Sequence, residues 1–161
     1  MKSFPTTRRP RQKLLVFARV PELGAVKTRL AATIGKERAL EAYRAMISDL
    51  LRSLDGLSSD IEVEVLWSGT EAVDGAALRA AFGERAFAMQ AGTTLEQRIV
   101  AAFSERIIFH QAAKVIAIGI DEPSLPGAMV DHAFRLLDSC EWGLGPAADG
   151  GRESPRAHVV A

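Results

Sequence analysis

The sequence predicts an α/β fold of three layers, in which a mainly parallel sheet is covered by helices on both faces. This prediction rests on apolar runs of strand type that alternate with amphipathic helical segments along the chain. Two of these runs, residues 14–18 and 114–120, are almost continuously apolar, as strands buried on both faces are. The 161 residues are 48% hydrophobic and 25% charged, which is the composition of one globular domain.

The predicted elements follow one another in a regular order. A basic arm at residues 1–12 is expected to be disordered, residues 13–151 form a single domain, and residues 152–161 form an atypical tail. Strands are predicted at residues 14–18, 61–67, 86–90, 114–120 and 142–145. Helices are predicted at residues 28–35, 36–54, 76–82, 93–109 and 126–137.

Local signals define the ends and faces of several elements. The helix at 36–54 has an apolar stripe with spacings of three and four residues, which indicates one buried face and no chemistry. Thr93 and Glu96 have the spacing of a capping box, and Ser124 is a suitable cap before the helix that starts at Pro126.

The strand at 61–67 alternates apolar and acidic residues, so Glu62 and Glu64 point to the same side. Two carboxylates so placed suit acid–base or metal chemistry, but a solvated face is the favoured interpretation.

Composition excludes several classes of function. A formal net charge of zero provides no field that attracts nucleic acid or an anionic membrane. The arginines of the basic arm are not interleaved with aromatic residues, so a solvated tail is favoured over a nucleic-acid contact. Cys140 is the only cysteine, the three histidines lack metal-ligand spacing, and no apolar run approaches the ~20 residues that span a bilayer. We therefore expect a cytoplasmic protein without nucleic-acid or membrane partners.

The loop after the first strand concentrates positive charge. Arg19, Gly24, Lys27 and Arg29 lie between a buried strand and the start of a helix, where α/β proteins bind anions. A loop with solvated cations is the alternative. The loop is not a Walker A motif, because Val26 stands where that motif has a glycine before its lysine.

Two aspartates follow predicted strands. Asp121 ends the run at 114–120, and Asp149 follows the strand at 142–145. The carboxyl ends of parallel strands share one edge of a sheet, so both residues are expected near the basic loop. Carboxylates and cations together suit a phosphate-bearing ligand with Mg²⁺. Each aspartate alone is also a common turn residue.

The sequence resembles the DUF2064 family, also described as glycosyltransferase A-like or selenodomain-associated transferase 1. The resemblance covers residues 14–151 and is carried by four segments, which are FARVPELGAVKTRLA at 17–31, QAGTTLEQR at 90–98, IGIDEPSL at 118–125 and LGPAADGG at 144–151. It implies a GT-A fold similar to that of nucleotide-sugar transferases and nucleotidyltransferases. By the family's usual length, the chain would lack the C-terminal part.

The resemblance also implies roles for individual residues. The nucleotide phosphates would be bound by Arg19, Gly24, Lys27 and Arg29, and the loop with Gln90 and Gly92 would lie near the base. Arg98 belongs to the same motif and is assigned to nucleotide binding; a basic residue early in a helix also favours a nearby anion. Asp121 and Asp149 would be the catalytic and metal-binding residues, with Mg²⁺ or Mn²⁺ as cofactor.

Two functions remain open at this point. The first is a metal-dependent transferase that moves a glycosyl or nucleotidyl group from a nucleotide or nucleotide-sugar to an unknown acceptor. The alternative is a catalytically impaired nucleotide-binding or interaction module, because the residues after 151 depart from the family and Glu122 replaces a usually small residue. A sheet edge without its last strand would favour a homodimer.

Overall fold

The computed structural model describes residues 12–69, 74–145 and 158–160. Its strands are β1 (Gln12–Arg19), β2 (Ile61–Ser68), β3 (Ala86–Met89), β4 (Lys114–Gly119), β5 (Gly143–Gly145) and β6 (His158–Val160). Its helices are α1 (Thr28–Ile34), α2 (Lys36–Ser53), α3 (Gly75–Phe82), α4 (Leu95–Ser104), the π-helix η1 (Glu105–Phe109) and α5 (Gly127–Leu136). Each strand and helix predicted from the sequence is present.

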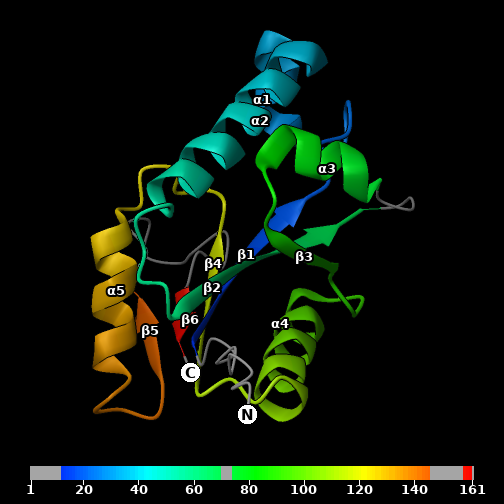
Figure 1. The fold of residues 1–161 in the computed structure, drawn as a ribbon. Coiled ribbons are helices and arrows are strands. Elements are labelled where there is room, and N and C mark those ends of the chain that lie inside the picture. Colours follow the sequence, from blue (N-terminus) through cyan, green and yellow to red (C-terminus); the bar gives the residue numbers. More distant parts are fainter. Residues whose placement is uncertain (1–11, 70–73, 146–157, 161) are drawn as a thin grey trace, which may run out of the picture.

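The strands form one sheet in the order β3-β2-β1-β4-β6-β5. β1 runs parallel to β2 and β4, and β2 runs parallel to β3. Parallel neighbours need a crossover connection, which here contains helices. The carboxyl ends of these four strands therefore lie along one edge (Figure 1). The predicted α/β fold with a mainly parallel sheet is confirmed.

β6 was not predicted. It lies between β4 and β5 and is antiparallel to both, although its residues were expected to form a tail. Three residues are too few for a period-two pattern to be recognised. The edge of the sheet on this side is β5. The homodimer expected from an incomplete sheet edge stays a prediction.

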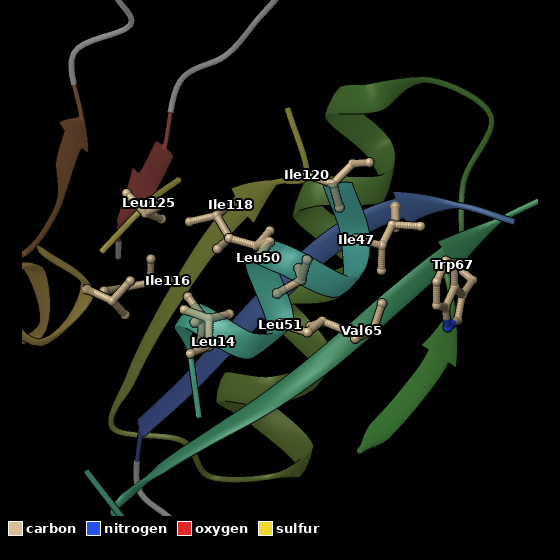
Figure 2. Close-up of a cluster of buried hydrophobic side chains, with 14 of the residues drawn as sticks. Leu14, Ile47, Leu50, Leu51, Val65, Trp67, Ile116, Ile118, Ile120 and Leu125 are labelled. Carbon is tan, nitrogen blue, oxygen red and sulfur yellow. The ribbon is translucent and has the colours of Figure 1, made fainter. Parts of the chain in front are cut away.

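Helices cover both faces of the sheet. On one face, Ile47 and Leu50 of α2 pack in a cluster with Leu14 and Val65 of the central strands (Figure 2). Burial of each such side chain contributes about 1.5–3 kcal/mol. On the opposite face, a smaller cluster joins Phe103 of α4 to the sheet, and α2 and α4 lie on opposite sides of the strands (Figure 1).

α2 has the two faces expected from its sequence. Its 18 residues bury Ala39, Tyr43, Ile47, Leu50 and Leu51 and leave charged residues in solvent. Among the described residues, no helix is both long enough and apolar enough to cross a membrane.

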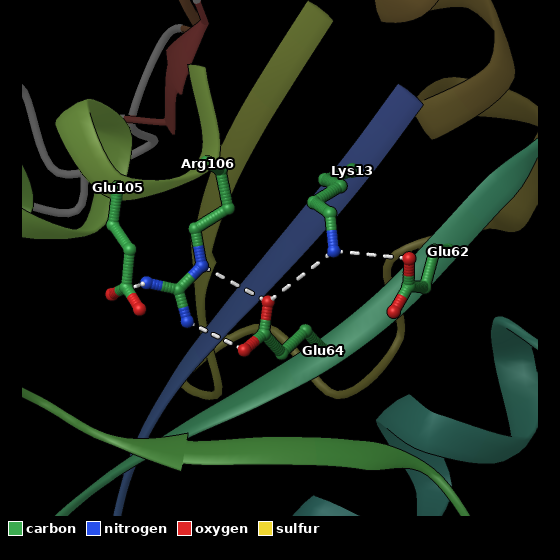
Figure 3. Close-up of polar contacts among 5 residues, drawn as sticks. All are labelled: Lys13, Glu62, Glu64, Glu105 and Arg106. Atoms are coloured by element: carbon green, nitrogen blue, oxygen red, sulfur yellow. Dashed lines mark hydrogen bonds and ion pairs between the residues drawn. The ribbon is translucent and has the colours of Figure 1, made fainter. Parts of the chain in front are cut away.

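Glu64 is buried, contrary to the expectation of a solvated face. Its side chain is 8% exposed and accepts hydrogen bonds from Arg106, at 3.0 Å from Nε and 2.5 Å from Nη2 (Figure 3). Lys13 Nζ lies 3.0 Å from Glu62 and 3.9 Å from Glu64, and Arg106 also pairs with Glu105. Burial lowers the pKa of Arg106, but hydrogen bonds and the charge of Glu64 more than offset this and leave the pKa above its usual value. The prediction was wrong because η1 brings an arginine over the polar side of β2.

The ends of α4 differ from the predicted ones. The capping box joins Thr94 to Gln97, one residue after the predicted Thr93 and Glu96. Thr93 contributes differently, since its backbone N–H and its hydroxyl both donate to Gln97 Oε1. The α-helix ends at Ser104 and continues as η1, whose wider turn directs Arg106 inward.

Ser124 does not cap α5. Its hydroxyl donates to Glu122 Oε1 at 2.7 Å, and the N-cap position belongs to Pro126, which makes no side-chain cap. Besides this contact, the turn between β4 and α5 is held by Ser53 of α2, whose hydroxyl donates to the backbone oxygen of Leu125 at 2.9 Å.

Candidate functional site

A cleft of about 570 Å³ opens where β1, β2 and β4 end. This volume lies in the range of small-molecule sites. Five of the residues proposed from the sequence line it, namely Arg19, Lys27, Gln90, Arg98 and Asp121. They come from three separate segments, 17–31, 90–98 and 118–125, that the parallel sheet brings to one edge.

The charges that line the cleft are unbalanced. Arg19, Lys27 and Arg98 contribute three cations, whereas Asp121 contributes the one carboxylate among the described lining residues. The side chain of Lys27 is 26% exposed and that of Asp121 is 46% exposed, so both remain accessible to a ligand. This arrangement favours an anion with more than one negative charge.

Lys27 reaches across the cleft to Asp121. Its Nζ lies 2.5 Å from Asp121 Oδ1. The backbone of Lys27 is left-handed, with φ 47° and ψ 45°, directly before α1. That conformation costs an L-residue roughly 1 kcal/mol, and such residues concentrate at functional sites. The sequence predicted that both residues belong to the site but not that they form an ion pair.

Tyr43 is a lining residue that sequence reasoning missed. It lies on α2, is 4% exposed, and its hydroxyl oxygen accepts from the backbone N–H of Arg19 at 2.8 Å. The same hydroxyl donates to the backbone oxygen of Arg19 at 3.1 Å. The sequence contained a signal for this residue. Tyr43 is the only tyrosine in the chain and lies on the apolar stripe of the helix at 36–54, where a buried hydroxyl needs a hydrogen-bond partner.

Gln90 ties two strand ends together. Its Nε2 donates to the backbone oxygens of Ala18, at 3.1 Å, and Leu66, at 2.7 Å. Its own backbone N–H donates to Trp67 at 2.8 Å. The side-chain carbonyl oxygen of Gln90 has no hydrogen-bond partner among the described residues.

Gly92 shapes the turn that positions Arg98. Its φ of +121° is left-handed, and a Cβ atom there would lie 2.8 Å from Cβ of Gln97 and 3.0 Å from the backbone nitrogen of Arg98. The guanidinium of Arg98 donates from Nε to the backbone oxygen of Gly92 at 3.0 Å. Gly92 therefore acts through the backbone and does not line the cleft itself.

Three further residues proposed for the site lie elsewhere. Gly24 has a left-handed φ of +78° and faces the side chain of Lys36, and Arg29 is exposed on α1; neither lines the cleft. Asp149 lies outside the described residues.

The described residues fit a divalent metal only in part. Within residues 12–69, 74–145 and 158–160, no group of three or more His, Cys, Asp or Glu side chains could hold a metal ion. Mg²⁺ is often held by one or two carboxylates together with substrate phosphates and water. The half-exposed carboxylate of Asp121 could supply one such oxygen ligand, although Lys27 is paired with its Oδ1.

Comparisons with known proteins identify the family and the fold. A family model described as "Uncharacterized protein conserved in bacteria (DUF2064)" matches residues 56–152. A crystal structure of a "putative nucleotide-diphospho-sugar transferase" from Desulfovibrio desulfuricans G20 is similar over 93% of this chain and 62% of that chain, with 28% identity and a TM-score of 0.82. None of the curated proteins matches the sequence.

A second solved structure shares the fold alone. It is a cytidylyltransferase from Leptospira borgpetersenii serovar Hardjo-bovis, matched over 80% of this chain and 50% of that chain, with 17% identity and a TM-score of 0.54. This chain thus spans less than two thirds of the length of both matched chains. The expected family and the expected fold of a nucleotide-diphospho-sugar transferase are confirmed.

Proposed function

The chain belongs to the DUF2064 family, and from this premise we propose that it binds a nucleotide or nucleotide-sugar together with Mg²⁺ or Mn²⁺. It then transfers a glycosyl or nucleotidyl group to an acceptor whose identity is open. The observation that carries this proposal is the cleft at the carboxyl edge of the sheet, where three cations surround one accessible carboxylate.

The basic residues are assigned to the phosphates. Arg19, Lys27 and Arg98 line the same cleft and supply preorganised positive charge where a diphosphate would lie. Arginine suits bidentate contacts with phosphate oxygens, and lysine supplies a compact charge. Gln90 presents a carbonyl oxygen that can accept a hydrogen bond from a nucleobase.

Asp121 is assigned to the metal. A divalent ion bound there would neutralise phosphate charge and stabilise the leaving group. The carboxylate of Asp121 would orient that ion, and Lys27 would move from Asp121 to the phosphates. Asp149 is proposed from the family resemblance as a second metal-binding or acceptor-side residue.

A thermal-shift screen tests the proposal directly. Nucleoside triphosphates and nucleotide-sugars are compared with and without Mn²⁺. A ligand at 100 times its dissociation constant adds roughly 2.7 kcal/mol, which raises the melting temperature by about 5 °C for a domain of this size. A shift with one base that requires Mn²⁺ would support the proposal and identify the donor class. No shift with any compound, from a folded sample, would refute it.

A matched variant separates site binding from nonspecific charge effects. Lys27→Met should remove most of the shift, whereas Arg135→Met should retain it, because Arg135 is exposed on α5 and does not line the cleft. Equal loss in both variants would indicate nonspecific attraction of anions.

The alternative is a module that binds the nucleotide without transferring a group. One observation favours this module. The charge of Asp121 is already balanced by Lys27, so this carboxylate has a partner without a metal ion. Mass spectrometry that detects hydrolysis or exchange of a bound nucleotide-sugar distinguishes the transferase from the binding module. Binding without turnover in the presence of varied acceptors would favour the module.

A further inference from the structure

The hydroxyl of Tyr43 occupies an unusual position, between the two backbone polar groups of a single residue. It accepts from the N–H of Arg19 at 2.8 Å and donates to the carbonyl oxygen of Arg19 at 3.1 Å. The tyrosine ring comes from α2, which lies on one face of the sheet, and its side chain is almost completely buried. One hydroxyl thus satisfies both backbone groups at the end of β1.

The reason for this contact lies in the register of the sheet. The ladder between β1 and β4 ends at the pair Phe17 and Gly119. Successive residues of a strand direct their backbone N–H and C=O groups to opposite neighbours. The next residue, Val20, donates to Ser68 of β2, so Arg19 must point to the other side. The backbone groups of Arg19 therefore face the side where β4 has already ended. Without Tyr43 they would have no strand partner there, and such groups are costly when buried.

The cleft brings Tyr43 close to the metal-binding candidate. Asp121 lies in the turn beyond the end of β4, two residues after the last ladder pair of Phe17 and Gly119. Tyr43, Arg19 and Asp121 all line the cleft. Burial raises the pKa of Tyr43 to about 12; the hydrogen bond to the Arg19 backbone lowers it, and the negative charge of Asp121 raises it. The phenol therefore stays protonated at neutral pH and keeps its donor.

We propose that Tyr43 is a positioning residue for the ligand site, whose hydroxyl replaces the missing strand partner of Arg19 and holds that residue at the rim of the cleft. The side chain of Arg19 is exposed there and free to contact an anionic group. Tyr43 acts through the backbone of Arg19 and does not itself bind the phosphates. This inference rests on the proposed nucleotide-binding function.

The test compares Tyr43→Phe with Ile47→Val. The first variant removes one oxygen and keeps the ring in the core. The second removes one methylene one turn further along α2, from a side chain that is completely buried, and lowers stability without removing a contact to the backbone of Arg19. Nucleotide affinity is measured by calorimetric titration in the presence of Mn²⁺, and amide hydrogen exchange is followed at Arg19. Circular dichroism checks that both variants are folded.

We expect Tyr43→Phe to weaken nucleotide binding by about tenfold, because binding must then order the backbone of Arg19, which Tyr43 no longer holds; a cost of about 1.4 kcal/mol corresponds to that factor. Exchange at the Arg19 amide should accelerate more than the change in global stability explains. Ile47→Val should leave the affinity and the relative protection of Arg19 unchanged. Equal effects of the two variants would overturn the positioning role, since stability alone would then account for them.

The two proposals fail in different ways. If the wild-type protein binds no nucleotide in this titration, the proposed function falls, and the positioning role that rests on it falls too. If the wild type binds and Tyr43→Phe binds equally well, only the positioning role is overturned.

Discussion

Lys27 Nζ lies 2.5 Å from Asp121 Oδ1, and this ion pair joins the loop after β1 to the turn after β4 across 94 residues of sequence. Exposed ion pairs of this kind contribute about 0–1 kcal/mol, so a ligand can separate them at little cost. A phosphate would attract Lys27 and a divalent ion would attract Asp121. Under the proposed function, the pair would hold the two groups next to each other until the phosphates and the metal ion bind.

The first prediction concerns which cation of the loop matters. Lys27→Met should weaken nucleotide binding by about tenfold, because loss of one charged hydrogen-bond donor to phosphate costs about 1.5 kcal/mol or more. Arg29→Met should change affinity less than twofold, since Arg29 is exposed and does not line the cleft. Calorimetric titration measures both. Equal losses would mean that Arg29 turns into the cleft when the ligand binds.

The second prediction concerns the carboxylate. Asp121→Asn should abolish the dependence of nucleotide binding on Mn²⁺, because a neutral amide cannot replace a carboxylate ligand. Affinity without metal should stay the same or rise, since Lys27 is released from its partner. The matched control is Asp138→Asn, which removes a carboxylate that lies 2.5 Å from Lys114 outside the cleft. An unchanged Mn²⁺ dependence in Asp121→Asn would remove Asp121 from the metal site.

The third prediction concerns the buried ion network of Figure 3. Glu64→Gln should lower the free energy of unfolding by about 3 kcal/mol, because it leaves the buried guanidinium of Arg106 without its main counter-charge. Glu62→Gln should cost about 1 kcal/mol or less, since the side chain of Glu62 is 32% exposed. Urea unfolding gives both values. Similar small losses in the two variants would show that Arg106 finds another partner.

The fourth prediction concerns pH. The pKa of Tyr43 rises from 10.0 to about 12 on folding, so the unfolded chain loses this proton first as pH increases. Stability from Tyr43 is therefore complete below pH 10 and declines between about pH 10 and pH 12, by on the order of 2 kcal/mol. Tyr43→Phe should lack this component of the decline. The comparison uses urea unfolding of both proteins across the alkaline range, and parallel curves would contradict the assignment.

Much of the fold was predictable because its signals are local. The apolar runs of β1 and β4 and the stripe of α2 are readable from residue type and spacing alone, and each was found in its expected place. Glu64 shows the limit of such signals. Its alternation with apolar neighbours indicates a half-exposed strand, but Arg106, 42 residues further along, covers that side. β6 was missed because three residues carry no recognisable period.

The candidate site also has features that the sequence predicts and features that only the structure shows. The sequence by itself determined that Lys27 and Asp121 belong to loops at the same edge of the sheet, because both follow buried parallel strands and such strands end together. It also determined the excess of basic residues there. Only the tertiary structure decided that Lys27 contacts Asp121, that Arg29 lies outside the cleft, and that Tyr43 completes the end of β1. These facts depend on the exact register between strands and on side-chain direction. Both are set by packing between segments far apart in the chain, so no local sequence pattern predicts them.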